Sequence, residues 1–84
     1  MKTYLVTFRS VTYAQRADRL LKSHGYACEI RRTPRWLEEQ GCGYSLRVRT
    51  NDAAGAARAL MEAELPMRKI FMVRPDGSLE ELVL

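Results

Sequence analysis

The sequence has few of the residues on which small secreted and metal-binding domains depend. Its 84 residues include two cysteines and one histidine, whereas a structural zinc site needs about four such ligands. Two cysteines also fall short of the disulfide framework that holds small extracellular domains together. We therefore expect Cys28 and Cys42 to be reduced thiols, and we expect no metal site.

Long apolar segments are also missing. The N-terminal stretch MKTYLVTFRS contains an apolar run shorter than the core of a signal peptide. No segment reaches the roughly 20 apolar residues that a membrane-spanning helix requires. We therefore expect a cytoplasmic protein that has no membrane partner.

The residue patterns of a self-sufficient enzyme are absent as well. The sequence has no catalytic triad, no phosphate-binding glycine loop and no paired acid and base. A chain of 84 residues supplies one modest core and no separate catalytic lobe. A carrier or binding module is therefore expected rather than an enzyme, and no cofactor is implied.

The charge balance is mildly basic. Fourteen basic and ten acidic residues give a formal net charge of +4, and eleven of the basic residues are arginines. The planar guanidinium of arginine suits two-pronged contacts with phosphate or carboxylate. Acidic residues are interleaved along the whole chain, so the charge alone does not predict nucleic-acid binding.

Alternating apolar and polar residues predict four strands, and helical spacing predicts two helices between them. The order is β-α-β-β-α-β. Right-handed crossovers turn this order into a ferredoxin-like α+β fold, an antiparallel four-stranded sheet with both helices on one face and the first and third strands in the centre. The strands are expected over residues 3–10, 26–32, 42–50 and 67–73.

Capping residues and glycines set the expected helix ends. Thr33, Pro34 and Gly41 predict one or two further helical turns between the second and third strands. The two main helices are bounded by Ser10 or Thr12 and Gly25, and by Asn51 or Asp52 and Pro66.

The end of the chain and the open face of the sheet point to further contacts. Residues 1–75 are expected to form a single domain, and residues 76–84 a C-terminal tail that is either a helix or an edge strand. This tail would pack on the domain or on a partner. Leu5 and part of the pair Ile70 and Met72 are expected on the open face, where such a patch fits a homodimer or a non-catalytic regulatory module.

The predicted topology gives Cys42 a defined neighbourhood. The third strand starts at the same end of the sheet as the end of the first strand, the start of the first helix and the end of the second strand. A helix N-terminus carries about half a positive charge, and together with arginines it favours a thiolate over a thiol. Gly41 and Gly43 leave the sulfur accessible because neither has a side chain. The residues expected around Cys42 are Arg9, Ser10, Arg31, Arg32 and Thr33.

A free cysteine is more often a small buried residue than a nucleophile, and this alternative stays open for Cys42. Cys42 falls on the same face of its strand as Leu46 and Val48, which should pack on the helices. Cys28 lies in the middle of a strand on the core face, so its role is expected to be structural. A disulfide between the two cysteines is not expected, because a separation of roughly 13 Å exceeds disulfide reach.

Three stretches of the chain resemble a family of small bacterial domains described as putative selenium or sulfur carrier protein-like. They are YLVTFRSVTYAQRADRLLK, RRTPR and GCGYSLRVR, and the resemblance covers residues 4–66. The tail after Pro75 departs from the family's pattern, and the biochemical role of the family is largely unassigned. The site residues implied by the resemblance are Cys42 as the carrier thiol, Gly43 beside it, and Thr33, Pro34 and Arg35 as the accompanying loop.

We therefore expect a carrier-like domain in which Cys42 holds sulfur or selenium as a persulfide or a selenosulfide. The expected partners are a cysteine desulfurase or a selenium-donor protein, and an acceptor protein that receives the atom. The sequence leaves the choice between sulfur and selenium open. The residues expected to favour the thiolate and to attract an acidic partner are Arg9, Arg31, Arg32 and Arg35.

A nucleic-acid or anion-binding module is the main alternative, because the RNA-recognition motif shares the ferredoxin-like architecture. The stretch CGYSLRVR resembles that motif's third strand only at its glycine and its aromatic residue. Tyr44 cannot offer a stacking surface on the open face while Leu46 and Val48 need the same side for the core. Arg47 and Arg49 could still contact phosphates.

Overall fold

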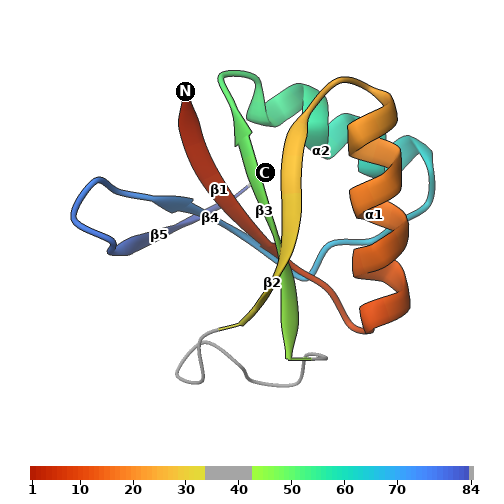
Figure 1. Ribbon diagram of the computed structural model, residues 1–84, viewed down its shortest axis with the longest axis horizontal. Coiled ribbons are helices and arrows are strands. Elements are labelled where there is room, and N and C mark those ends of the chain that lie inside the picture. The colour runs from red at the N-terminus through yellow and green to blue at the C-terminus, as the bar shows by residue number, and fades with distance from the viewer. Residues whose placement is uncertain (34–42, 84) are drawn as a thin grey trace.

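Five strands and two helices make up residues 1–33 and 43–83, the part of the chain that the computed structural model describes. Neighbouring strands pair antiparallel in the order β2-β3-β1-β4-β5, and both helices cover one face of the sheet (Figure 1). The predicted α+β class with two helices is confirmed. The strands are β1 (Lys2–Thr7), β2 (Ala27–Arg32), β3 (Tyr44–Thr50), β4 (Lys69–Val73) and β5 (Leu79–Leu82), and the helices are α1 (Val11–Ser23) and α2 (Ala53–Glu62).

The fifth strand comes from the C-terminal tail, whose conformation the sequence left open. In β5, Leu79 pairs with Val73 and Leu82 pairs with Ile70 of β4. Gly77, in the turn between the two strands, has a left-handed backbone with a φ of 87°. The prediction of four strands was therefore wrong, because the tail completes the backbone hydrogen bonding of β4.

Local hydrogen bonds explain where α1 begins and ends. The Ser10 side chain accepts the backbone N–H of Tyr13, which identifies Ser10 rather than Thr12 as the N-cap. Gly25 follows the helix with a φ of 89°, so the predicted glycine terminator is confirmed.

The second helix begins as predicted but ends early. The Asp52 carboxylate accepts the N–H of Gly55 at 3.0 Å and caps α2. The helix ends at Glu62, so the prediction that Pro66 closes it was wrong. Glu64 adopts the left-handed conformation with a φ of 58° and turns the chain away before Pro66 is reached. α1 and α2 are the helices of the described residues. Neither of them is long and apolar enough to cross a membrane.

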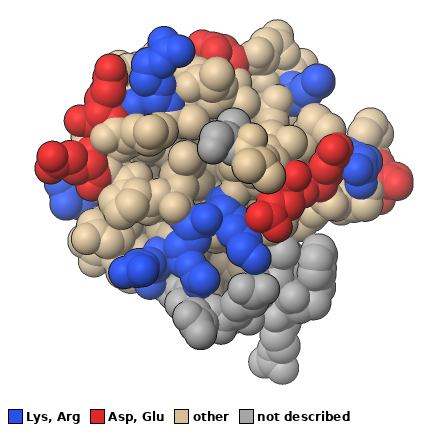
Figure 2. Space-filling model, turned by 180° about the vertical axis from the view of Figure 1, so that it is seen from behind, with Lys and Arg blue, Asp and Glu red and all other residues tan. Residues whose placement is uncertain are grey.

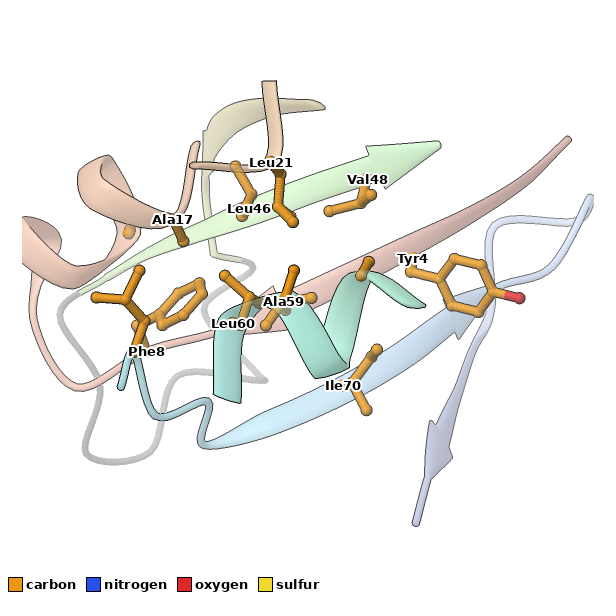
Figure 3. Close-up of a cluster of buried hydrophobic side chains, with 13 residues drawn as sticks. Tyr4, Phe8, Ala17, Leu21, Leu46, Val48, Ala59, Leu60 and Ile70 are labelled. Carbon is orange, nitrogen blue, oxygen red and sulfur yellow. The ribbon is translucent and has the colours of Figure 1, made fainter. Parts of the chain in front are cut away.

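The core lies between the sheet and the two helices (Figure 3). Alternate residues of β1 and β3 supply large side chains, whereas the helices contribute several alanines. Small side chains on the helices let them approach the sheet closely, so the core is filled mainly from the strands. The buried cluster consists of Tyr4, Val6, Phe8, Leu46, Val48 and Ile70 from the sheet side, and Ala14, Ala17, Leu21, Ala56, Ala59, Leu60 and Leu65 from the helix side.

The opposite face of the sheet also contains buried apolar residues. Leu5 and Phe71 pair across β1 and β4, and they are 4% and 5% exposed. The expectation that Ile70 or Met72 would share this face with Leu5 was wrong, because both pack against the helix-side cluster. The register explains the difference, since Ile70 pairs with the core residue Val6.

Candidate functional site

The residues predicted to surround Cys42 lie only partly within the described chain. Cys42, Pro34 and Arg35 lie outside the described residues, as do the helical turns predicted over residues 34–41. The remaining residues belong to one end of the sheet, where β1 and β2 end and β3 starts. They are Arg9, Ser10, Arg31, Arg32, Thr33 and Gly43.

A backbone hydrogen bond joins the two ends of residues 34–42. The Thr33 N–H donates to the Gly43 carbonyl at 2.9 Å, directly beyond the Arg32 and Tyr44 pair that ends the β2–β3 ladder. Thr33 and Gly43 are both buried. Gly43 has a φ of 82°, and a residue with a side chain is strained in this conformation. The backbone itself therefore requires glycine at this position. We call this pair the Thr33–Gly43 clamp.

The start of α1 lies at the same end of the sheet as the clamp. Thr7, the last residue of β1, pairs with Ser45 near the start of β3, and the chain continues through Arg9 to Ser10. The Arg9 side chain is exposed, and the first turn of α1 contains no acidic residue. The partial positive charge of the helix N-terminus is therefore not offset within its own first turn.

Arg31 and Arg32 are adjacent in sequence but face opposite sides of β2. Nε and Nη2 of Arg31 lie 2.9 and 2.8 Å from Oε1 of Glu29, so a carboxylate offsets this charge. The Arg32 guanidinium lies over the Tyr44 ring, 5.4 Å from its centroid, and Nη1 donates to the Tyr44 hydroxyl at 3.3 Å. The two guanidinium groups therefore have different partners. The two-residue alternation of a strand was the sequence signal that separates them.

Cys28, on β2, is held as a neutral thiol. Its Sγ–H donates to Oδ1 of Asp18 at 3.4 Å, and the Asp18 carbonyl oxygen lies 3.6 Å away. Burial raises the pKa of Cys28 to about 11, with further contributions from the hydrogen bond to Asp18 and its negative charge, while the charge of Lys22 acts in the opposite direction. A thiol of this kind is a weak nucleophile at neutral pH, which fits the structural role expected for it.

Metal-ligating side chains do not converge in the described residues. Within residues 1–33 and 43–83, no group of three or more His, Cys, Asp or Glu side chains is arranged to hold a metal ion. His24 is the C-cap residue of α1, where its backbone N–H donates to carbonyl groups of the last turn, and its side chain is exposed.

A second gathering of arginines lies on the face of the sheet opposite the helices. A groove of about 480 Å³ runs there between β2 and β3 on one side and the β4–β5 turn on the other. The sequence pattern did not predict it, because the β4–β5 turn forms only when the tail becomes a strand. Basic side chains also gather on the surface seen in Figure 2, with acidic side chains beside them. We call this feature the open-face groove; its lining includes Leu5, Arg31, Arg32, Arg47, Arg74 and Leu79.

The chain matches one family of known proteins over most of its length. A family model described as putative Se/S carrier protein-like matches residues 3–72. No curated protein shows a significant match to the chain. The matched region spans β1 to β4, and thus the clamp and the start of α1. The chain therefore belongs to the putative Se/S carrier protein-like family.

Proposed function

We propose that this domain carries sulfur or selenium on the thiol of Cys42, as a persulfide or a selenosulfide, between two partner proteins. Membership of the putative Se/S carrier protein-like family is the observation that carries the proposal. The donor is a cysteine desulfurase or a selenium-donor protein, and the acceptor is a second protein. The role requires a reducing compartment such as the cytoplasm, where a thiol stays free.

The transfer needs neither an oxidant nor a cofactor. The Cys42 thiol first loses its proton to solvent, and the thiolate attacks the outer sulfur of a persulfide on the donor. A new S–S bond forms on Cys42 as the S–S bond of the donor breaks, and the donor cysteine leaves as a thiolate. The same exchange, with Cys42 as the leaving thiolate, passes the sulfur to the acceptor.

The described residues next to Cys42 in the chain support an anionic sulfur. Cys42 is bonded to Gly43, which belongs to the Thr33–Gly43 clamp at the end of the β2–β3 ladder. The N-terminus of α1 begins at the same end of the sheet, and the guanidinium of Arg32 lies over the ring of Tyr44 there. A helix N-terminus and a guanidinium both lower the pKa of a nearby thiol.

We also propose that the architecture is ferredoxin-like and extended by β5. The order β2-β3-β1-β4, with α1 between β1 and β2 and α2 between β3 and β4, supports this assignment. In this arrangement the ends of β1 and β2 flank the start of β3, and Cys42 precedes β3 in the sequence by two residues.

Sulfur loading tests the proposal directly. The chain is incubated with a cysteine desulfurase and cysteine, and its intact mass is compared with that of the untreated protein. We expect one added sulfur atom, which fragmentation assigns to Cys42 and which a reductant removes.

The chain provides its own matched control in the second cysteine. We expect Cys28→Ser to load sulfur like the parent, and Cys42→Ser to load none. Loading of Cys28 in preference to Cys42, or no loading of either cysteine from sulfur and selenium donors alike, would rule out the carrier role.

A further inference from the structure

Arg47 is the arginine of the open-face groove whose own contacts are incomplete. It lies on β3, with Glu29 of β2 and Leu5 of β1 as its cross-strand partners. The Glu29 carboxylate forms an ion pair with Arg31. Arg47 itself has no ion pair among the described residues. Nε of Arg47 is buried and has no hydrogen-bond partner there. A buried, charged donor without an acceptor is unfavourable, and a rotation of the Arg47 side chain toward the groove would let an anion there supply the acceptor.

Three further arginines, Arg31, Arg32 and Arg74, line the groove together with Arg47. Arg31 and Ser45 are opposite each other across β2 and β3, so Arg31 and Arg47 are diagonal neighbours on one face. Arg74 lines the groove from the β4–β5 turn, and its Nη2 lies 3.1 Å from Oε1 of Glu80. The ion pairs of Arg31 and Arg74 are solvent-exposed, and such pairs leave their cations able to contact a second anion.

The remaining lining of the groove is largely apolar. Leu5, Val73 and Leu79 line it beside the arginines. Its volume of about 480 Å³ falls in the range of about 300–1,000 Å³ that is typical of small-molecule sites. A single inorganic anion would leave most of this space empty.

The charge and the shape together define the class of ligand. Guanidinium groups bind phosphate oxygens through paired, charge-assisted hydrogen bonds. A phosphate monoester carries about −1.5 to −2 charges at pH 7. The four arginines of the groove lining, of which Arg31 and Arg74 are paired with exposed glutamates, can balance this charge. We propose that the open-face groove binds a phosphate monoester that bears an apolar group, with Arg47 as the central phosphate contact.

Single-stranded nucleic acid fits this face less well. Proteins that bind single strands stack bases on exposed aromatic side chains. Phe71, on the open face, is only 5% exposed, and the Tyr44 ring already lies against the Arg32 guanidinium. The groove therefore offers cations and aliphatic surface rather than a stacking surface.

The experiment is an NMR titration of the ¹⁵N-labelled full chain with phenyl phosphate. We expect saturable shifts of the backbone signals of Leu5, Arg47 and Val73, and a downfield shift of the Arg47 Nε–H signal as it gains an acceptor. Inorganic phosphate tests whether the apolar group matters, and we expect it to bind about tenfold more weakly or worse.

The matched control is Arg49, on the same strand and the same face but outside the groove lining. We expect Arg47→Gln to weaken phenyl phosphate binding about tenfold or more, Arg47→Lys to weaken it in part, and Arg49→Gln to leave it unchanged. Thermal unfolding of each variant checks that the fold is kept.

Three results would overturn the proposal. The first is equal weakening by Arg47→Gln and Arg49→Gln, because that is the behaviour of general surface charge. The second is an unchanged Arg47 Nε–H signal at saturation. The third is tighter binding of a short oligouridylate that shifts the same groove signals, which would assign the face to nucleic acid. None of these results bears on sulfur loading of Cys42, so the two proposals fail separately.

Discussion

Cys28 offers a quantitative test of the structure, because Cys42→Ser leaves it as the single thiol of the chain. Its environment raises its pKa from 9.0 to about 11. A shift of this size lowers the thiolate fraction about 100-fold at any pH well below the ordinary pKa, and the alkylation rate should fall in proportion. Cys28 in the folded protein should therefore react with iodoacetamide about 100-fold more slowly than in the unfolded chain.

The assay is the pH dependence of alkylation of Cys42→Ser, followed by mass spectrometry. Its midpoint reports the pKa of the thiol, whereas limited access to the sulfur lowers the rate at every pH. We expect a midpoint near 11 in the folded protein and near the ordinary value of 9.0 in concentrated urea. The folded protein holds the Cys28 proton more tightly than the unfolded chain does. This contribution to stability is thus complete below pH 9 and is lost as the pH rises through about 11.

Asp18→Asn separates the causes of the shift. It removes the negative charge next to the sulfur and keeps an oxygen at the same position. Because burial is the largest cause, we expect the midpoint to fall but to stay above 9.0. A folded-state midpoint near 9.0, or a midpoint that Asp18→Asn leaves unchanged, would refute the reasoning.

The remaining predictions concern the free energy of unfolding, measured by urea denaturation. Glu64→Gly should raise it by about 1 kcal/mol, because residue 64 has a φ of 58° that glycine adopts without strain. Gly77→Ala should lower it by about 1 kcal/mol through backbone strain alone, since a Cβ there meets no atom within 4 Å. Leu46→Ala should lower it by about 2–5 kcal/mol, because the side chain is fully buried. If Glu64→Gly lowers the free energy of unfolding, or if Gly77→Ala leaves it unchanged, the left-handed backbone described at residues 64 and 77 is contradicted. If Leu46→Ala leaves it unchanged, the burial described for Leu46 is contradicted.

Signals that depend on neighbouring residues predicted most of the fold. The alternation of β1 and β3 placed Tyr4 and Leu46 correctly on the helix-facing side. A side-chain oxygen just before a helix can accept an N–H of the first turn, which limited the predicted caps to Ser10 or Thr12 and to Asn51 or Asp52. The structure selects Ser10 and Asp52. Gly25 marked the end of α1 through the conformation that only glycine adopts freely.

Contacts between distant residues decided what the sequence left open or misplaced. β4 contains the continuous apolar run IFMV, so no alternation shows that Phe71 faces away from the helices while Ile70 faces them. The tail is rich in leucine and glutamate, which favour helices, yet the unpaired edge of β4 draws it into β5. Asp76 and Gly77 indicate a turn before the tail, but they do not decide between a strand and a helix after it.

The candidate site was also predictable from the sequence only in part. The clamp residues Thr33 and Gly43 belong to loop positions that the sequence singled out, but the hydrogen bond between them spans ten positions. The placement of Cys42 lies outside the described residues, so its predicted neighbourhood stays a prediction. The open-face groove could not be predicted because it needs Arg47 and the β4–β5 turn together.

The Thr33–Gly43 clamp also bears on how members of such a family can diverge. It pairs the residues on either side of the nine-residue segment 34–42, and this pairing continues the β2–β3 ladder by one hydrogen bond. Doubling the length of a closed loop costs only about 0.6 kcal/mol. We therefore propose that residues 34–42, which include Cys42, can be exchanged or lengthened while β2 and β3 stay paired, and urea denaturation of a chain with this segment doubled in length tests the proposal.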